Sequence, residues 1–400
     1  MCHVRNSLTK KRTAAFALTT SLLALTLAAP ASAGTQPAVT GTISLGSPTN
    51  IGGDGPLGVA VDPLRGIVYV CQSNYTQGLG YVQVIDENTN AITATITVGH
   101  YPYAIAIDPI HWVVWVTNYL DASVSAIDER TNTVIATLPT GSTPHDITVD
   151  PFRGTVYVAN DGGRSITVID EATLTVTNTV TVPNNLNSVG IGVDPVRGLV
   201  GVAAFSVGFV SSYLLVLDER TNQFIDTVTV LAAGPTVQER VAVDSIRKAF
   251  YLPDIETGTL DVISDPDFVV KAYIPTGSPV ASQGPFGVAE DPITGLVYTV
   301  NSGAAAVAAI DPQKRVVEAT IPIPNAQGLN FIALDPVRGL AYVVANTSNT
   351  LTVISTGKGT ACKDLQNYPL LPLLCETSLY NSKPGQDRPF WPWADAQNFH

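Results

Sequence analysis

The sequence is poor in charged residues and in long apolar runs. Charged residues make up 14% of its 400 positions, against about a quarter in ordinary soluble domains. Hydrophobic residues make up 45%, which is enough to bury a large core and too many for a disordered chain. Beyond the N-terminal region no stretch reaches 18 consecutive apolar residues. We therefore expect no membrane-spanning helix.

Basic residues are scarce outside the first 33 positions. Those positions hold four basic residues and no acid, so the rest of the chain carries 17 basic and 33 acidic residues and a net charge of −16. Such a surface repels phosphate backbones and anionic membranes. The composition predicts no nucleic-acid partner and favours simple solubility outside the cell.

Several motifs of known chemistry are missing. The sequence has no Gly-x-Ser-x-Gly elbow, no phosphate-binding glycine loop, no dinucleotide fingerprint and no CxxC or CxxCH. No cofactor is implied, and a structural zinc site is not expected. Cys362 and Cys375 are 13 residues apart in an irregular tail, and we expect a disulfide between them. Cys71 ends an apolar strand and is expected to be a buried, inert thiol.

The first 33 residues have the pattern of a signal peptide. A basic stretch, Lys10 to Arg12, precedes an apolar run from Ala14 to Ala29, and Ala31-Ser32-Ala33 follows. Signal peptidases cleave after such small-x-small patterns. We expect cleavage after Ala33 and a secreted protein, with the export route left open.

The remaining sequence contains seven copies of one unit. A phrase of the form V-D-P-x-R-G-x-V-Y-V recurs at spacings of 46, 42, 44, 50, 47 and 44 residues. Its aspartates, called the repeat aspartates below, are Asp62, Asp108, Asp150, Asp194, Asp244, Asp291 and Asp335. A second phrase, x-V-x-V-I-D, ends 20 to 24 residues later at Asp86, Asp128, Asp170, Asp218, Ser264, Asp311 and Ser355. Two phrases in constant order at one period indicate a repeat architecture.

Each unit is expected to form four short strands separated by Gly, Pro and Asn turns. Seven four-stranded units of this length predict an all-β, seven-bladed β-propeller over residues 34–356. The seventh unit has no fourth strand, whereas residues 39–46 match a fourth strand and precede the first unit. We therefore expect this N-terminal strand to close the last blade and to hide its edge.

Three units carry short phrases that resemble the YVTN-type β-propeller repeat family, which includes surface-layer-type propellers. The phrases are Tyr157-Val-Ala-Asn160, Trp115-Val-Thr-Asn118 and Tyr298-Thr-Val-Asn301, and the resemblance covers residues 39–356. It implies the propeller fold and an exported or cell-surface protein. It implies little about chemistry.

Residues that recur in all seven units are interpreted as scaffold, including the repeat aspartates and the Pro-x-Arg-Gly turns. The copies diverge four and five positions before the repeat aspartates, where the chain enters the inner strand. These positions and the loops between second and third strands should surround one mouth of the central channel. The candidate ligand-binding residues are Tyr103, His145, Asp146, Asn160, Asp161, Glu239, Arg240, Asp254 and Asn330.

A metal site was considered at the same mouth, from His100 and His145 with Asp146 or Asp161. Glu290 stands where the other units are apolar, and a carboxylate there needs a partner or a raised pKa. His111 and Trp112 are a change from the repeat in a turn on the opposite face. We interpret that change as a surface substitution.

Three functions fit this sequence. The first is a secreted, non-catalytic binding or interaction protein, expected to be monomeric, whose partner is a small molecule, an extracellular protein or a cell-envelope component. The second is an enzyme of the lactone-hydrolase, cycloisomerase or lyase kind, with His145 as acid or base, Glu239 or Glu290 as its partner and Arg240 as a carboxylate clamp. The third is an envelope-associated structural protein. The tail, 357–400, either packs on the propeller, binds a partner or is disordered.

Overall fold

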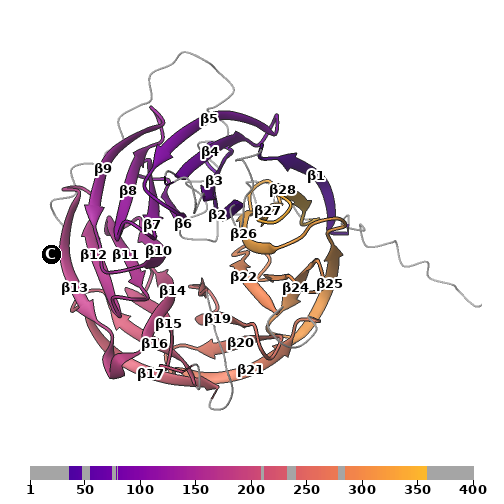
Figure 1. The fold of residues 1–400 in the computed structure, drawn as a ribbon. Helices are drawn as coiled ribbons and strands as arrows, with labels where there is room; N and C mark the ends of the chain where they lie inside the picture. Colours follow the sequence, from indigo (N-terminus) through magenta and orange to yellow (C-terminus); the bar gives the residue numbers. More distant parts are fainter. Residues whose placement is uncertain are drawn as a thin grey trace, which may run out of the picture. The chain divides into compact units, whose positions relative to one another are not determined.

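The computed structural model describes residues 36–46, 55–73, 78, 80–208, 211–231, 240–277 and 284–357. These residues form seven antiparallel sheets of four strands each. The sheets stand around a central axis as the blades of a propeller (Figure 1). The prediction of an all-β, seven-bladed β-propeller is therefore confirmed.

Blades 1 to 6 each use four consecutive strands. Blade 1 consists of β2 (Gly55–Asp62), β3 (Ile67–Ser73), β4 (Gly80–Asp86) and β5 (Ala91–Val98). Blade 2 consists of β6 (Pro102–Asp108), β7 (Val113–Asn118), β8 (Ser123–Asp128) and β9 (Thr133–Pro139). Blade 3 consists of β10 (Pro144–Asp150), β11 (Thr155–Asn160), β12 (Ser165–Asp170) and β13 (Thr175–Thr181).

A short 3₁₀ turn, η1 (Pro183–Asn185), leads into blade 4. Blade 4 consists of β14 (Asn187–Asp194), β15 (Leu199–Phe205), β16 (Ser212–Asp218) and β17 (Gln223–Leu231). Blade 5 consists of β18 (Ala242–Asp244), β19 (Ala249–Asp254), β20 (Thr259–Ser264) and β21 (Val269–Pro275). Blade 6 consists of β22 (Pro285–Glu290), β23 (Val297–Asn301), β24 (Ala306–Asp311) and β25 (Val316–Pro322).

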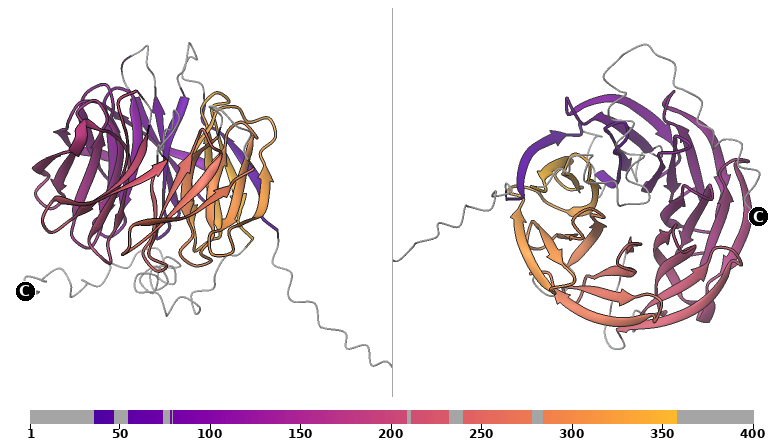
Figure 2. Two further views of the ribbon diagram at one scale, coloured as in Figure 1. Left: turned by 90° about the horizontal axis from the view of Figure 1, so that it is seen from below. Right: turned by 180° about the vertical axis from the view of Figure 1, so that it is seen from behind.

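Blade 7 is assembled from both ends of the described chain. It consists of β26 (Leu329–Asp335), β27 (Leu340–Ala345), β28 (Thr350–Ser355) and, as its outer strand, β1 (Ala38–Ser44). The pairing of β1 with β28 is antiparallel, from Ala38 opposite Ser355 to Ser44 opposite Thr350. In Figure 2 the indigo β1 lies along the edge of the yellow-orange blade. The predicted closure of the last blade by the N-terminal strand is confirmed.

The repeat aspartates hold the turn between the first and second strand of every blade. The carboxylate of Asp62 accepts hydrogen bonds from the backbone N–H groups of Leu64 (2.8 Å) and Arg65 (3.3 Å). The same two contacts recur in the other six blades. Gly66 ends the turn at a φ of 68°, which favours glycine. The interpretation of this recurrent motif as scaffold agrees with these contacts.

The arginine of the turn connects neighbouring blades. Its guanidinium pairs with its own repeat aspartate and with an acid of the next blade, as Arg153 does with Asp150 (2.5 Å) and Glu219 (3.1 Å). In four cases this acid follows the third strand of the next blade, whereas the partner of Arg247 is Glu290, which ends a first strand. We call these contacts the interblade belt. Its arginines are Arg65, Arg153, Arg197, Arg247 and Arg338.

The core lies between blades. Second and third strands are buried along their length, as in β7, where all six residues are buried. One cluster packs Tyr69 and Val82 of blade 1 against Ile105 and Val114 of blade 2, and similar clusters join the other blades. Fourth strands such as β9 alternate in exposure at the perimeter. Because each blade needs its neighbours to bury both faces, the ring is one cooperative unit.

Candidate functional site

The seven inner strands surround the axis and pair on one side only. β2, β6, β10, β14, β18, β22 and β26 are each the end strand of their sheet. Their second edges, with backbone N–H and C=O groups, therefore face the central channel. Six of these strands shift register near their first residues, as β10 does between Pro144 and Asp146. A β-bulge re-aims side chains and is common next to binding sites.

The position four residues before the repeat aspartate lies within or next to these bulges. Four blades carry a small residue there: Gly58, Ala104, Gly190 and Gly287. A larger residue would collide with the neighbouring inner strand, since a Cβ on Gly287 would lie 2.6 Å from the carbonyl oxygen of Asn330. The three exceptions are Asp146, Arg240 and Phe331. These three side chains occupy equivalent places on blades 3, 5 and 7.

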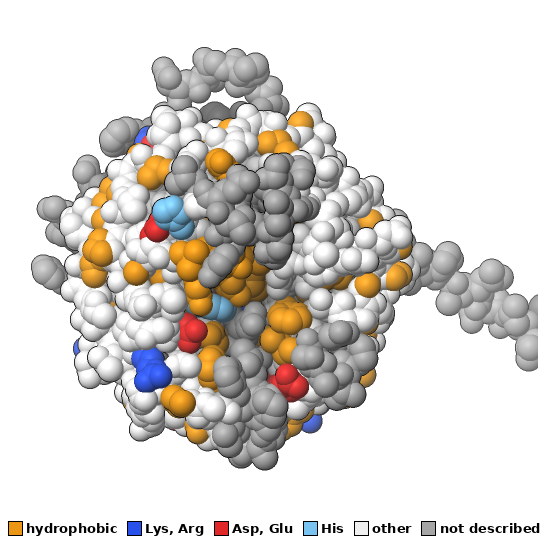
Figure 3. Space-filling view, in the orientation of Figure 1, with side chains coloured by type: hydrophobic (Ala, Val, Ile, Leu, Met, Phe, Trp, Pro, Cys, Tyr) orange, Lys and Arg blue, Asp and Glu red, His pale blue; other side chains and the backbone are white. Residues whose placement is uncertain are grey.

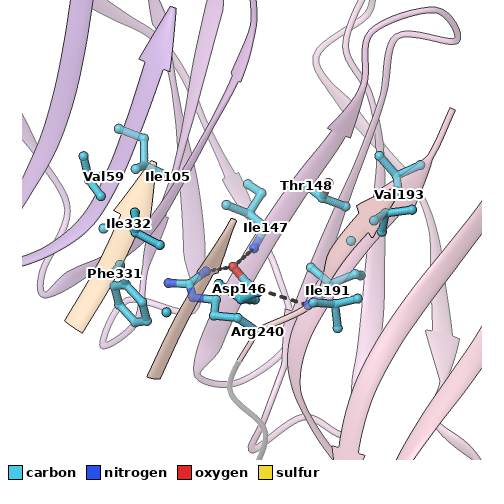
Figure 4. A pocket seen from close by; sticks show the side chains of 16 residues that line it. Val59, Ile105, Asp146, Ile147, Thr148, Ile191, Val193, Arg240, Phe331 and Ile332 are labelled. Atoms are coloured by element: carbon cyan, nitrogen blue, oxygen red, sulfur yellow. Dashed lines mark hydrogen bonds and ion pairs between the residues drawn. The ribbon is translucent and has the colours of Figure 1, made fainter. Parts of the chain in front are cut away.

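A cavity of about 270 Å³ opens between the inner strands, and all seven blades contribute to its wall. Asp146, Arg240 and Phe331 line it together with Val and Ile residues of the inner strands (Figure 4). Its volume lies near the lower end of small-molecule sites, roughly 300 to 1,000 Å³. Figure 3 shows hydrophobic side chains gathered around the hollow at the centre of the molecular face. The site therefore suits a small ligand.

Asp146 organises the polar side of the cavity. Its side chain is 3% exposed, and Oδ1 accepts hydrogen bonds from the backbone N–H of Ile147 (2.9 Å) and from Nη1 of Arg240. Oδ2 accepts a hydrogen bond from the backbone N–H of Ile191 on the neighbouring inner strand (3.0 Å). Asp146 thus joins blades 3, 4 and 5. A carboxylate with several donors holds its charge well in a buried place.

Arg240 is fixed on two sides and retains an unused donor. Its Cζ lies 3.8 Å from the ring centroid of Phe331, a cation–π contact. Its Nε is buried and has no hydrogen-bond partner among the described residues. The side chain is 15% exposed, and burial lowers the pKa of its guanidinium to about 10, so it remains charged at neutral pH. A buried donor of a charged group without an acceptor is costly.

Aromatic rings cover one side of the mouth. The ring of Tyr103 lies 4.2 Å from that of His145 and 5.8 Å from those of Tyr119 and Phe331. Tyr101 extends the cluster, 5.9 Å from Tyr119. These rings come from blades 2, 3 and 7 and form one aromatic cluster.

His145 is neutral in this setting. Its Nδ1 lies 2.9 Å from the carbonyl oxygen of Val189, and because a carbonyl only accepts, Nδ1 carries the proton. Burial lowers the pKa of His145 to about 3, with the nearby Arg240 charge adding to the shift. The lone pair on Nε2 remains available as a hydrogen-bond acceptor.

The structure brings Tyr103, His145, Asp146 and Arg240 together at this mouth. Asn330 is half-buried beside Phe331. Asp161, after β11, is also half-buried, and burial raises its carboxyl pKa.

Two other predicted residues brace the blades. The Nδ2 of Asn160 donates to Ser165 and Thr167 within blade 3. Asp254 accepts from the backbone N–H groups of Glu256 and Thr257. Neither is among the residues that line the cavity.

Glu239 lies outside the described residues, and so do residues 1–33, which were predicted to be a signal peptide, and Cys362 and Cys375. Glu290 pairs with Arg247 (3.5 Å) in the interblade belt, at the end of the inner strands away from His145. The two acids named as partners for His145 are therefore not observed beside it among the described residues. Cys71 is buried, and burial raises its thiol pKa, as expected for an inert thiol.

The residues suggested for a metal site at the mouth are not gathered into one group among the described residues. His100 pairs through Nδ1 with Asp121, and His100, His145 and Asp146 do not come together as a ligand group. Within the described ranges, one group of three potential ligands lies within 4.8 Å, and it consists of Asp108, His111 and Glu171. His111 was interpreted as a surface substitution.

Three features of these sites were not predicted from the sequence: the position of Tyr101, the acids of the interblade belt and the Asp108–His111–Glu171 group. Tyr101 follows His100 in a joining loop, and nothing in the repeat marks it. The acids of the belt recur directly after the second repeated phrase, at Glu87, Glu129, Glu171, Glu219 and Asp265, which was a readable signal. Combining that recurrence with a histidine at the arginine position would have located the Asp108–His111–Glu171 group.

Comparisons with known proteins support the fold. No protein-family model matches the chain, and no curated protein matches it. Among solved structures, hydrazine synthase from Kuenenia stuttgartiensis is similar, with a TM-score of 0.67 and 19% identity over 78% of this chain and 98% of that chain. Within the described segments, no helix has the length and hydropathy to cross a bilayer. The chain shares the β-propeller fold, and the YVTN-type repeats remain a resemblance.

Proposed function

We propose that this chain is an exported, non-catalytic binding protein that takes a small carboxylate-bearing molecule at the channel mouth. One observation carries the proposal. At the seven equivalent inner-strand positions, four blades have glycine or alanine and three have a larger side chain. The three larger side chains, Asp146, Arg240 and Phe331, meet at one cavity. Side chains that depart from the repeat and meet at a cavity are typical of a binding site on a regular scaffold.

The chemistry of the cluster favours a planar oxyanion. Arg240 is held by Asp146 and Phe331, so little side-chain entropy is lost when a ligand binds. A ligand carboxylate oxygen at Nε would satisfy the buried donor that has no partner among the described residues. The ring faces of Tyr103 and Phe331 would pack against the rest of a flat molecule.

An enzyme of the lactone-hydrolase, cycloisomerase or lyase kind is less well supported. A general base works best with a pKa near the operating pH. The pKa of His145 is lowered to about 3, and its Nδ1 is used by Val189. Binding is therefore the function that the geometry supports best.

The binding test uses matched ligands. Aromatic and aliphatic monocarboxylates, benzoate among them, are screened by thermal shift beside their neutral amides, and hits are measured by calorimetry. We expect carboxylates to raise the melting temperature and amides not to, because a ligand at 100 times its Kd adds about 2.7 kcal/mol to stability.

The variant Arg240→Lys keeps the charge that Asp146 needs but removes the planar fork. We expect it to bind the selected carboxylate at least tenfold more weakly, about 1.4 kcal/mol. Arg220→Lys, at an exposed turn of blade 4, is the matched control and should bind normally. Equal binding by both variants, or equal binding of acid and amide, would refute the proposal.

Export is proposed from residues 1–33, which lie outside the described residues. Mass spectrometry of the protein released by its host should find a mature N-terminus at Gly34. A chain that keeps Met1 and stays inside the cell would contradict this part of the proposal and leave the binding test unaffected.

A further inference from the structure

The interblade belt has a different residue in blade 2. In five blades an arginine lies between the repeat aspartate and an acid of the next blade, as Arg65 does between Asp62 and Glu129. In blade 2 this place belongs to His111, between Asp108 and Glu171. The two carboxylates remain as in the other blades, while the fixed cation is replaced by a side chain that binds metals in many proteins.

The three side chains form a compact group. Nδ1 of His111 lies 2.8 Å from Oδ2 of Asp108 and 3.2 Å from Oε2 of Glu171. Asp108 is fully buried and Glu171 is 5% exposed, whereas the His111 side chain is 49% exposed. The group is therefore anchored in the scaffold and open to solvent on the histidine side.

Glu171 is only half satisfied. Its Oε1 accepts a hydrogen bond from Nε1 of Trp115 (2.7 Å), but its buried Oε2 has no hydrogen-bond partner in the described part of the chain. The reason is geometric: Nδ1 of an imidazole carries one hydrogen, and it is directed at Asp108. A guanidinium has five N–H donors, and in five other blades it lies within ion-pair distance of both acids. Buried oxygens of Glu87 and Glu219 also have no hydrogen-bond partner among the described residues, but each faces a permanent cation.

We propose that Asp108, His111 and Glu171 bind a divalent transition-metal ion of the Zn²⁺ type. Two carboxylate oxygens and one imidazole nitrogen are a ligand set that suits such ions, and the exposed side leaves room for water to complete the coordination. The two negative charges balance the ion. Binding at Nδ1 requires that the proton there leaves: a neutral ring then carries its one proton on Nε2, and a cationic ring releases one proton to solvent.

This site differs from the ligand pocket in place and role. It lies at the turn that follows the inner strand β6, whereas the pocket lies between the inner strands and is lined by residues before those turns, such as Ile105 of β6. Because Asp108 and His111 belong to blade 2 and Glu171 to blade 3, a bound ion clamps two blades, as the arginine does elsewhere. Metal binding should therefore raise the stability of the ring.

The test uses the full exported chain without a histidine tag, stripped of metal and titrated with ZnCl₂, MnCl₂ or MgCl₂ by calorimetry. We expect one equivalent of Zn²⁺ to bind, with a rise in melting temperature, and Mg²⁺ not to bind.

His111→Arg restores the residue found in five other blades, so it should fold and lose Zn²⁺ binding. Changing an outer-shell residue already costs 10–100-fold in metal affinity, so loss of a ligand should cost at least about 100-fold. Glu171→Gln should also weaken binding and serves if His111→Arg proves unstable. His100→Arg, at the exposed His100–Asp121 pair, is the control and should bind Zn²⁺ as the parent does. No zinc binding by the parent, or equal binding by His111→Arg, would overturn the proposal.

Discussion

At the scale of single residues, the seven copies provide an internal comparison. Where a side chain recurs, as the repeat aspartates do, it has a local structural task that is the same in each blade. Departures are more informative, but their meaning differs. Arg240 faces a cavity, His111 replaces a fixed cation, and Glu290 supplies an acid to the belt from a first strand instead of a turn.

Glu290 leads to a prediction about pH. Burial raises its carboxyl pKa to about 9, with Asp244 adding and Arg247 opposing, whereas an unfolded Glu titrates near 4.3. Between these values the folded state holds a proton that the unfolded state lacks, so stability falls as pH rises. We expect Glu290→Gln to reduce the loss of unfolding free energy with rising pH by up to about 1.4 kcal/mol per pH unit.

Urea unfolding at pH 5, 7 and 9 measures the effect. Glu87, Glu129 and Glu219 have pKa values raised to about 8 by burial and act in the same direction in parent and variant. The exposed Glu318, changed to Gln, is the control and should leave the slope unchanged. A parent stability that rises between pH 5 and 9 would contradict the prediction.

At the scale of elements, the inner strands decide where the site lies. They approach each other so closely that four blades carry only glycine or alanine at the positions within or next to their bulges, and the three larger side chains line the cavity. The bulges matter because they change which side chains face the channel. Spacing from the repeat aspartate identifies these positions along the sequence. The direction in which their side chains point depends on the bulged strand pairing, which the spacing does not show.

Because the inner strands lie so close together, substitution of an inner-strand glycine should destabilise the protein more than substitution of an outer-strand glycine. Gly287→Ala places a Cβ 2.6 Å from the carbonyl oxygen of Asn330 and 3.0 Å from Cα of Phe331, so backbone must move. We expect a loss of about 1–3 kcal/mol. Gly41→Ala in the outer strand β1 meets its nearest atom, Cβ of Val353, at 4.0 Å and should be tolerated. Chemical denaturation compares them, and an equal effect of both changes would refute the argument.

At the scale of the whole molecule, closure of the ring depends on one strand. β1 supplies the outer edge of blade 7 and buries Ile43 and Leu45 in the core between blades 7 and 1. Oxygen and nitrogen atoms of the loop after β1 also pair with Asn349. Without this strand, β28 would present an unpaired edge to solvent.

Deleting residues 36–46 should therefore open blade 7. Burial of each large aliphatic side chain is worth roughly 1.5–3 kcal/mol, and the exposed edge should promote association. We expect a lower melting temperature and soluble aggregates by light scattering. A synthetic peptide of residues 36–46 added to the truncated protein should reverse both effects. A monomeric truncated protein of unchanged stability would show that closure does not depend on β1.

The sequence by itself determined the number of blades, their four-stranded pattern and the closing strand, because these follow from local patterns repeated at a fixed period. Positions near the channel mouth also followed from the repeat. Only the tertiary structure decided which departures meet. Arg240 and Asp146 are 94 residues apart, and Glu171 and His111 belong to different blades. Their contact depends on the rotation between blades and on the bulges, and neither is encoded in the spacing of residues along one unit.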